Sequence, residues 1–329
     1  MMYFQIIFLL FIFLFQSNVL AAEITNNFEG KWIGVEVMGC DPKTAARVRS
    51  IIPINEGELF SSANSDEYKK WCDVIRSEFE NNKVTCSFIG YDGGKFYYDV
   101  EFIKKNNDYL FREIPKSIRN NVKINSELLD FYNKFDTLYC SKVSSGIFSL
   151  ENFDKGYLDF DDPELHALAE PLSKLARPNS QNLLDVIEYS NDAELRALAA
   201  RLLSWSQSPE IVQYIIDREF LNDPNAFVRN DVARTLSIYL EHMAGGALKD
   251  IVLEKGVNAF CKQAALPSHA DRNKALYSLN AIVSKNPNAI NVIDQNCMAT
   301  LNEIAETSIL PNAGGIAKEI LKNIDINKA

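Results

Sequence analysis

The chain has 329 residues, of which 47% are hydrophobic and 24% are charged, and its formal net charge is −10. This length and composition are typical of a folded protein with two domains, each large enough to have its own core. Residues 151–329 carry 17 Lys and Arg against 25 Asp and Glu, which excludes the basic face that nucleic-acid binding normally requires. We therefore expect no nucleic acid as a partner, and instead another protein that is basic or neutral.

Residues 1–22 have the pattern of a secretory signal peptide. An apolar run from about Ile6 to Phe15 is too short to span a bilayer, and it is followed by polar residues and the small-residue exit Val19-Leu20-Ala21. We expect cleavage here, export to the periplasm or the medium, and a mature protein that is soluble and not integral to the membrane. Because the segment lacks Lys and Arg, an uncleaved anchor is the alternative.

The next part, residues 23–105, predicts a small α/β domain. Apolar residues alternate with polar or small ones in KWIGVEVMG, which indicates a strand. Apolar residues stand at helical spacing in DPKTAARVRSIIPI and in EYKKWCDVIRSEFENN, which indicates two helices. VTCSFIGYD and KFYYDVEFIKK then flank the turn Gly93-Gly94 and predict a hairpin. The predicted order is strand, helix, helix, strand, strand.

This order, with a glycine after the first strand, resembles a POTRA domain, the polypeptide-transport-associated module, over about residues 30–105. The resemblance implies recognition of an extended polypeptide by an exposed strand edge. Two features depart from the pattern, because Cys40 stands where a polar turn residue is usual and no transmembrane barrel follows. The alternative is a generic α/β domain.

Residues 106–160 predict a helical linker. The segment LLDFYNKFDTLYCSKV has apolar residues spaced for one helix face, and the acidic segment DKGYLDFDDPE follows it.

The remaining part, residues 161–329, predicts repeated helical hairpins. DPNAFVRNDVARTL begins with Asp223 and Pro224, which suit the cap and the first position of a helix, and small or apolar residues follow at helical spacing. NDAELRALAARLL, 33 residues earlier, repeats the pattern, as do HADRNKALYSL, the stretch at Ile316 and a weaker first copy from Asp162. A second apolar-striped helix follows the copies before Ile316. Hairpins of this kind must stack to bury their apolar faces.

This pattern resembles HEAT repeats over roughly residues 160–325. The predicted fold class is thus α+β, with a small N-terminal β-α-α-β-β domain followed by an all-α solenoid of HEAT-like helical hairpins. The resemblance implies a structural ladder of aspartate and arginine side chains between neighbouring hairpins, here Asp192, Arg196, Asp223, Arg229, Asp271 and Arg272.

Six cysteines in an exported chain predict disulfides, with four in the first half (Cys40, Cys72, Cys86, Cys140) and two in the second. Cys261 and Cys297 lie one hairpin apart in the predicted helices, so we expect a disulfide between them. Buried reduced thiols are the alternative.

No catalytic motif, metal site or cofactor is predicted. His166, His242 and His269 lie near predicted helix ends without a second ligand at metal-binding spacing, which favours surface positions. An acidic cluster could hold calcium, but capping of a helix by Asp162 is the simpler explanation (Asp159, Asp161, Asp162 and Glu164).

These observations predict an exported, non-enzymatic adaptor that binds another protein on the concave face of the acidic solenoid. An enzyme, lyase-like or acting on an envelope component, and a secreted host-directed factor are the alternatives. If the second helix of each hairpin lines that face, six polar residues are candidates for partner contact: Gln213, Asp217, Lys249, Glu254, Asn291 and Asp294.

Overall fold

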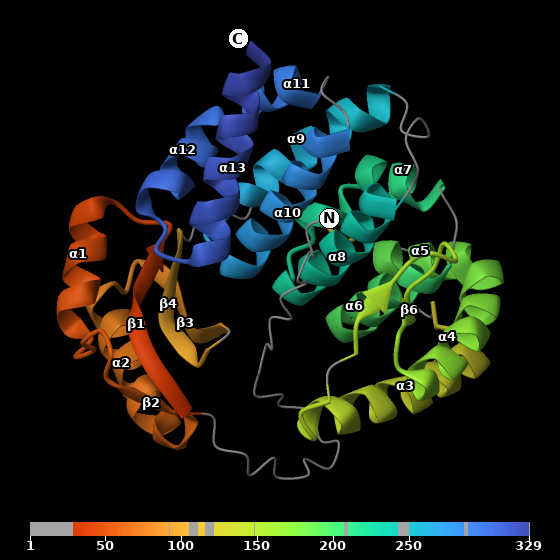
Figure 1. Cartoon of the computed structure of the whole chain (residues 1–329), viewed down its shortest axis with the longest axis horizontal. Helices are drawn as coiled ribbons and strands as arrows, with labels where there is room; N and C mark the ends of the chain where they lie inside the picture. The colour runs from red at the N-terminus through yellow and green to blue at the C-terminus, as the bar shows by residue number, and fades with distance from the viewer. Residues whose placement is uncertain are drawn as a thin grey trace. The chain divides into compact units, whose positions relative to one another are not determined.

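The structure, a computed structural model, describes residues 29–91, 93–104, 111–115, 122–147, 149–206, 210–242, 250–285 and 289–328. The predicted signal peptide lies outside these residues. The chain forms two compact units, and each is described by itself. Unit 1 contains Met1–Asn107, Pro267–His269 and Thr307–Gly314; unit 2 contains Asp108–Leu266, Ala270–Glu306 and Gly315–Ala329. A small N-terminal sheet followed by helices confirms the α+β class (Figure 1).

Unit 1 is built on a four-stranded sheet with the order β2-β1-β4-β3. β1 (Glu29–Met38) pairs parallel to β4 (Lys95–Lys104), and β3 (Asn82–Tyr91) pairs antiparallel to β4 along its whole length. The short β2 (Leu59–Ser61), which the sequence did not predict, pairs antiparallel to the start of β1. Three residues are too few to show an alternating pattern.

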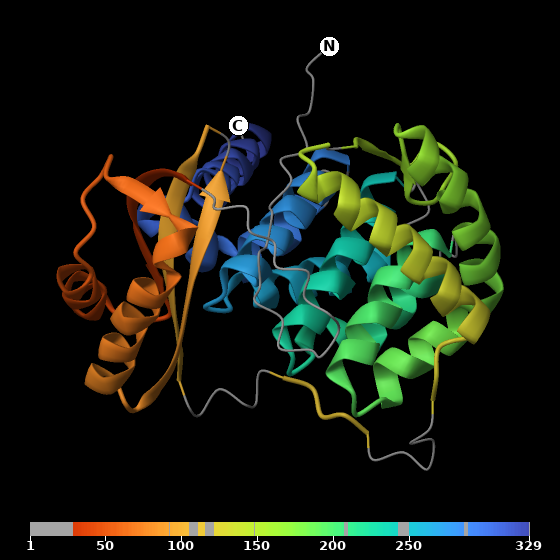
Figure 2. The ribbon, with the colours of Figure 1, turned by 90° about the horizontal axis from the view of Figure 1, so that it is seen from below.

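Two helices cover one face of this sheet, α1 (Pro42–Ile51) and α2 (Ser65–Glu78) (Figures 1 and 2). Asp41 begins α1, because its carboxylate accepts hydrogen bonds from the backbone N–H groups of Lys43 and Thr44, both at 3.0 Å. The core between helices and sheet is aromatic, and Trp32 packs edge-on against Phe60 with ring centroids 4.8 Å apart. Strand alternation and helical spacing therefore supply this core as predicted.

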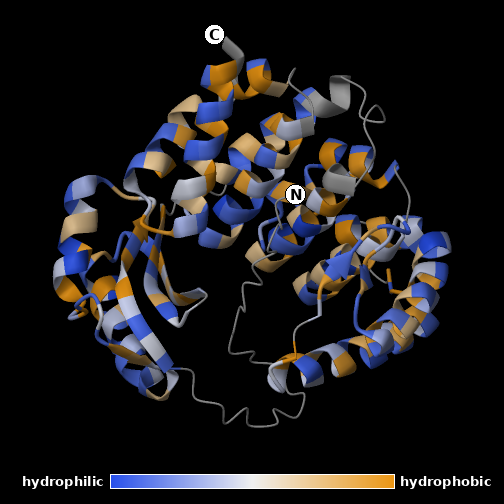
Figure 3. Ribbon diagram, viewed as in Figure 1, coloured by the Kyte–Doolittle hydropathy of each residue, from blue (hydrophilic) through white to orange (hydrophobic). Residues whose placement is uncertain are grey.

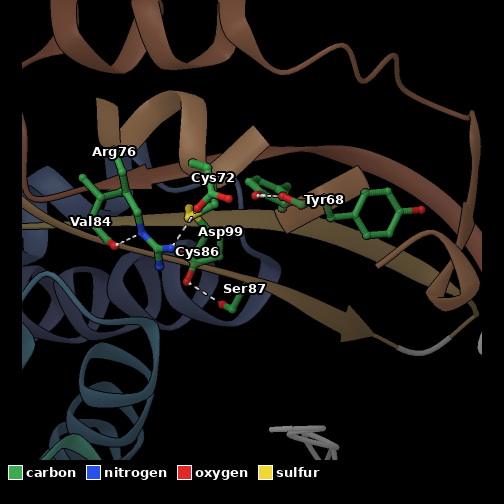
Figure 4. The surroundings of a disulfide bond; sticks show 9 residues. Tyr68, Cys72, Arg76, Val84, Cys86, Ser87 and Asp99 are labelled. Carbon is green, nitrogen blue, oxygen red and sulfur yellow. Dashed lines mark hydrogen bonds and ion pairs between the residues drawn. A yellow bond between two sulfur atoms is a disulfide. The ribbon is translucent and has the colours of Figure 1, made fainter. Parts of the chain in front are cut away.

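A disulfide joins α2 to β3 in unit 1. Cys72 and Cys86 lie with their Cα atoms 5.9 Å apart, and Arg76, one turn further along α2, donates to the Val84 carbonyl on β3 at 3.0 Å (Figure 4). Cys40 and Cys140 are free thiols.

Unit 2 begins with α3 (Ser126–Ser144), which lies in the predicted helical linker and packs against α4 (Pro163–Ala176). Two short strands, β5 (Glu151–Asn152) and β6 (Asp159–Phe160), pair between these helices. Asp162 caps α4 by accepting from the N–H groups of Glu164 and Leu165, which confirms its predicted role.

The remaining helices lie in unit 2, except that His269 of α10, Thr307 of α12 and the first turn of α13 belong to unit 1. They are α5 (Ser180–Tyr189), α6 (Ala193–Leu202), α7 (Glu210–Asp217), α8 (Ala226–His242), α9 (Asp250–Ala264), α10 (His269–Lys285), α11 (Ala289–Asn296), α12 (Met298–Thr307) and α13 (Pro311–Lys328). Helix α6 packs on α8, while α5 packs on α7, α7 on α9 and α9 on α11. Apolar and polar residues alternate around these helices (Figure 3), as expected of amphipathic helices buried on one face.

Two details differ from the prediction. Asp223 does not cap α8, which begins at Ala226, because the side chain of Asn225 accepts from the N–H groups of Phe227 and Val228 instead. The carboxylate of Asp223 is paired with Arg196. In addition, the single helix expected over residues 288–306 is two helices, α11 and α12, which meet at Cys297.

Cys297 and Cys261 lie at bonding distance with their Cα atoms 5.2 Å apart, which fits the predicted disulfide. This bond connects α9 to the junction of α11 and α12. Within the described residues, no helix is long and apolar enough to cross a membrane.

Candidate binding surface of unit 2

The structure describes the side chains of four of the six predicted partner contacts, and they lie on the neighbouring helices α7, α9 and α11. Asp217 is exposed at the end of α7, Glu254 is exposed on α9, and Asn291 is exposed on α11. Gln213 is half-buried on α7. Lys249 and the side chain of Asp294 lie outside the described residues. Since α7, α9 and α11 pack in series, the described candidates lie along one row of helices.

Asp217 is the centre of a small polar group. Its carboxylate accepts from the amide of Gln213 at 2.6 Å and from the ammonium of Lys255, on α9, at 2.7 Å. The hydrogen bond from Lys255, followed by that from Gln213, lowers the pKa of Asp217 below its usual value. Because both charged side chains are about half exposed, this pair contributes only about 0–1 kcal/mol to stability and stays available to a ligand.

A shallow hollow of about 290 Å³ adjoins this pair. It lies between α7, α9 and the 3-10 turn η5 (Phe220–Asn222). Its lining combines apolar residues with charges of both signs: Ile215, Ile216, Asp217, Glu219, Leu221, Asn222, Lys255, Asn258, Ala259 and Lys262. The sequence analysis named only Asp217 among them. Lys255 and Lys262 are seven residues apart on α9, which places them on one face of that helix, but their sequence alone does not mark them as a site.

Four of the six residues named for the aspartate and arginine ladder form two ion pairs in unit 2. Arg196 on α6 contacts Asp223 at 2.9 Å, and Arg229 on α8 contacts Asp271 on α10 at 2.7 Å. Both pairs are buried. The first joins α6 to the residue that follows η5, and the second joins α8 to α10. Each arginine also donates to a backbone carbonyl close to its own helix, Ser190 or Asp223.

The ladder ends at the first and last predicted members. Asp192 caps α6 by accepting from the N–H groups of Glu194 and Leu195. Arg272 lies 3.3 Å from Glu303, which is largely exposed. The equivalent of Arg196 in the first repeat is His166, which belongs to a different group.

The acidic side chains around the start of α4 are paired with nearby lysine and histidine side chains. Asp159 is 1% exposed and contacts Nδ1 of His166 at 2.8 Å and the ammonium of Lys155 at 3.3 Å. Lys142 on α3 donates to Asp162 at 2.8 Å. Over the described ranges, the structure contains no group of three or more His, Cys, Asp and Glu side chains arranged to hold a metal ion.

The predicted surface position is wrong for one histidine. His269, the first residue of α10, is 2% exposed, because the segment Pro267–His269 packs within unit 1. His166 is partly exposed. The side chain of His242 lies outside the described residues.

Unit 1 buries a group of carboxylates that the sequence analysis did not single out. Asp99 on β4 is fully buried, lies directly opposite Glu36 on β1 and is followed two residues later by Glu101. Ser87 on β3 donates to Asp99 at 3.2 Å (Figure 4). Burial, followed by the charges of Glu101 and Glu36, raises the pKa of Asp99 well above its usual value.

The backbone of unit 1 supplies donors to the two glutamates. Glu36 accepts from the N–H of Ile309 at 2.9 Å, and Glu101 accepts from the N–H of His269 at 2.8 Å. Both donors belong to the short segments 267–269 and 307–314 of this unit. The alternation in YYDVEF placed these acids on the face opposite the apolar core, and that face is buried as well.

Comparisons with known proteins identify no family for this two-unit α+β chain. No protein-family model matches it, and no curated protein matches it. Among solved structures it is similar to two engineered proteins of the Northeast Structural Genomics Consortium. One is 20% identical with a TM-score of 0.37, over 50% of this chain and 74% of that one. The other is 20% identical with a TM-score of 0.26, over 50% of this chain and 94% of that one. Both TM-scores are too low to carry an argument about the fold.

Proposed function

We propose that this protein is an exported, non-enzymatic adaptor that binds another protein through the row α7, α9 and α11 of unit 2, as the concave face of a HEAT-like solenoid. The observation that carries this proposal is the exposed polar surface around Asp217, Lys255 and Glu254, beside the hollow. Charges of both signs next to apolar side chains suit the rim and centre of a protein interface.

Export is supported by the two cysteine pairs at bonding distance, since disulfides persist in oxidising compartments. The predicted signal peptide supports it independently. Fractionation of cells between periplasm and medium distinguishes an envelope role from a secreted, host-directed one.

Charge reversal tests the partner surface. We expect the double variant Asp217→Lys/Glu254→Lys to lose capture of the partner that the wild-type protein retains from envelope extracts, by at least about tenfold. The matched control is Glu319→Lys, which reverses an exposed acid on α13. Equal capture by the wild-type protein and the double variant would refute the surface.

The edge of unit 1 supports a second mode of protein binding. β3 is ten residues long and stands at the end of the strand order, so only one of its edges is paired within the sheet. Such an edge can add an extended peptide by main-chain hydrogen bonds. A peptide bound in this way would slow hydrogen exchange of β3 amides, and unchanged exchange in the presence of the captured partner would exclude this mode.

An enzyme remains the alternative class, and it would require titratable groups that converge on a pocket. In the described part of the chain, the hollow beside Asp217 brings together lysines and acids at an open surface, which fits an interface better.

A further inference from the structure

A short segment between β4 and α3 packs against the Arg196–Asp223 ion pair of unit 2, which is called the first rung of the ladder below. The segment is Phe111–Pro115, and its backbone bonds to η5, because the N–H of Arg112 donates to the carbonyl of Asn222 at 2.7 Å. Two side chains, Phe111 and Arg112, make its other contacts with the helices.

The side chain of Arg112 is 7% exposed, and two acceptors contact its Nη2 atom. Its Nη2 atom donates to the carbonyl of Ile187 and to Oδ2 of Asp223, both at 2.7 Å. The guanidinium also lies over the ring of Phe220, 4.8 Å from the centroid. The guanidinium of Arg229 in turn lies over the ring of Phe111, 4.8 Å from the centroid of that ring.

These acceptors come from three different parts of unit 2. Ile187 is in the last turn of α5, where carbonyl groups have no partner within the helix and the helix dipole is negative. Asn222 belongs to η5, and Asp223 follows it. The Ile187 carbonyl and the Asp223 carboxylate accept from Nη2 of the guanidinium, and the Asn222 carbonyl accepts from the backbone N–H of Arg112. Among the described residues, the buried Nε atom has no hydrogen-bond partner. The planar guanidinium also stacks on the ring of Phe220, a contact that a lysine ammonium reproduces poorly.

The rung itself is complete without Arg112. Arg196 already donates to both carboxylate oxygens of Asp223, from Nε at 3.0 Å and from Nη2 at 2.9 Å. At the next rung, Asp271 is paired with Arg229, and the additional donor is Gln263 of the adjoining helix α9. At Asp223 that additional donor comes from the connecting segment instead.

Burial of Arg112 has a cost that the contacts must offset. Loss of hydration lowers the pKa of its guanidinium, and the charge and hydrogen bond of Asp223 oppose this effect.

We propose that this group of acceptors is a recognition site for an arginine side chain on an extended peptide, preceded by an aromatic residue, and that Phe111–Arg112 occupies it in cis. A partner segment of the same chemistry binds by displacing the chain's own arginine. The tethered segment competes at an effective concentration of about millimolar, so it sets the affinity that a partner must exceed. The site shares Asn222 with the lining of the hollow, but its contacts include none of Asp217, Glu254 or Asn291, so charge reversal at the partner surface and peptide binding at this site can fail independently.

The test uses the full chain and a labelled, end-blocked peptide LFREIP, which copies residues 110–115. By fluorescence anisotropy, we expect the peptide to bind the double variant Phe111→Ala/Arg112→Ala at least about tenfold more tightly than the wild-type chain. The control peptide LFKEIP should bind the double variant at least about tenfold more weakly than LFREIP. Equal binding of LFREIP to both chains, equal binding of the two peptides, or no binding to a folded double variant would overturn the proposal.

A second measurement does not depend on the variant's folding. In the wild-type chain, a large excess of LFREIP should speed hydrogen exchange of the Arg112 amide, whose bond to Asn222 is lost on displacement, whereas the same excess of LFKEIP should not. Unchanged exchange with LFREIP, or equal acceleration by both peptides, would contradict displacement.

Discussion

Buried carboxylates are accommodated in two different ways in this chain. Asp223 and Asp271 are paired with arginines at less than 3 Å, so that each buried carboxylate lies beside an opposite charge. Asp99 is surrounded by two further acids and a serine, and burial favours its neutral form. The two environments therefore predict different effects of mutation, on the pH dependence of stability for Asp99 and on the free energy of unfolding for the ladder.

The Asp99→Asn substitution should flatten the pH dependence of stability. Because the pKa of Asp99 is raised from 3.8 in the folded chain, the folded state holds a proton that the unfolded state lacks between 3.8 and the raised value. Stability is therefore expected to fall as the pH rises through this window. Urea unfolding at about pH 5 and about pH 8 should show a smaller difference for Asp99→Asn than for the wild-type chain. An unchanged difference would mean that Asp99 is ionised in the fold.

The Arg229→Met substitution should be strongly destabilising, because it leaves the buried carboxyl group of Asp271 without its main partner. We expect a loss of about 3–5 kcal/mol in the free energy of unfolding. The control is Lys69→Met, which breaks the exposed pair with Asp66 and should cost at most about 1 kcal/mol. Similar costs for the two variants in chemical denaturation would contradict a structural role for the ladder.

Among the elements, the helices begin where short polar side chains satisfy their first N–H groups, but the residue that does so is not always the one expected. Asp162 and Asp192 cap α4 and α6, whereas at α8 Asn225 takes the role predicted for Asp223. Asp223 and Asn225 both lie close to the start of α8. The carboxylate of Asp223 is paired with Arg196, a residue of another helix, so Asn225 caps α8 instead. The sequence pattern of one helix contains no information about that competitor.

The disulfides predict how many thiols can react. Without reductant and in denaturant, only Cys40 and Cys140 should react with a thiol reagent, because the other four cysteines are paired. The variant Cys261→Ser/Cys297→Ser should lose about 3–4 kcal/mol, as expected for a bridge between residues 36 apart. Cys40→Ser is the control and should change stability little. A count of six reactive thiols would exclude both bridges.

At the scale of the whole molecule, unit 1 is not one continuous stretch of sequence. It includes Pro267–His269 and Thr307–Gly314, whose backbone N–H groups bond to Glu101 and Glu36 on the second face of the sheet. The predicted boundary at residue 105 therefore omits part of the unit's own packing.

A fragment of residues 23–105 tests this division. We expect it to bind a hydrophobic dye and to unfold at lower denaturant concentration than the full chain, because Met38 and Tyr97 on the second sheet face would be exposed. A monomeric fragment as stable as the full chain would show that the two short segments are dispensable.

Much of the architecture follows from local patterns. The alternation in β1 and β4, the helical spacing in α1, α2 and the hairpin helices, and the pairing of Cys261 with Cys297 can be inferred from the sequence, since each depends on neighbours along the chain or on one repeat. Only part of the candidate surface could be predicted from the sequence. Lys255 and Lys262 line the hollow because α7 and η5 lie beside them, and the sequence of α9 does not specify those neighbours. The comparisons with known proteins add no further support.

The sequence by itself determined the order of the longer strands and of most helices, and the types of residue on their faces, because these depend on periodicity and helix ends. Only the tertiary structure decided which charged groups are buried together. Asp99, Glu36 and Glu101 meet on adjacent strands, and Arg112 reaches Asp223 across 111 positions of sequence. The physical reason is that desolvation and pairing act through space, so the state of a charged side chain depends on neighbours that its own segment does not specify.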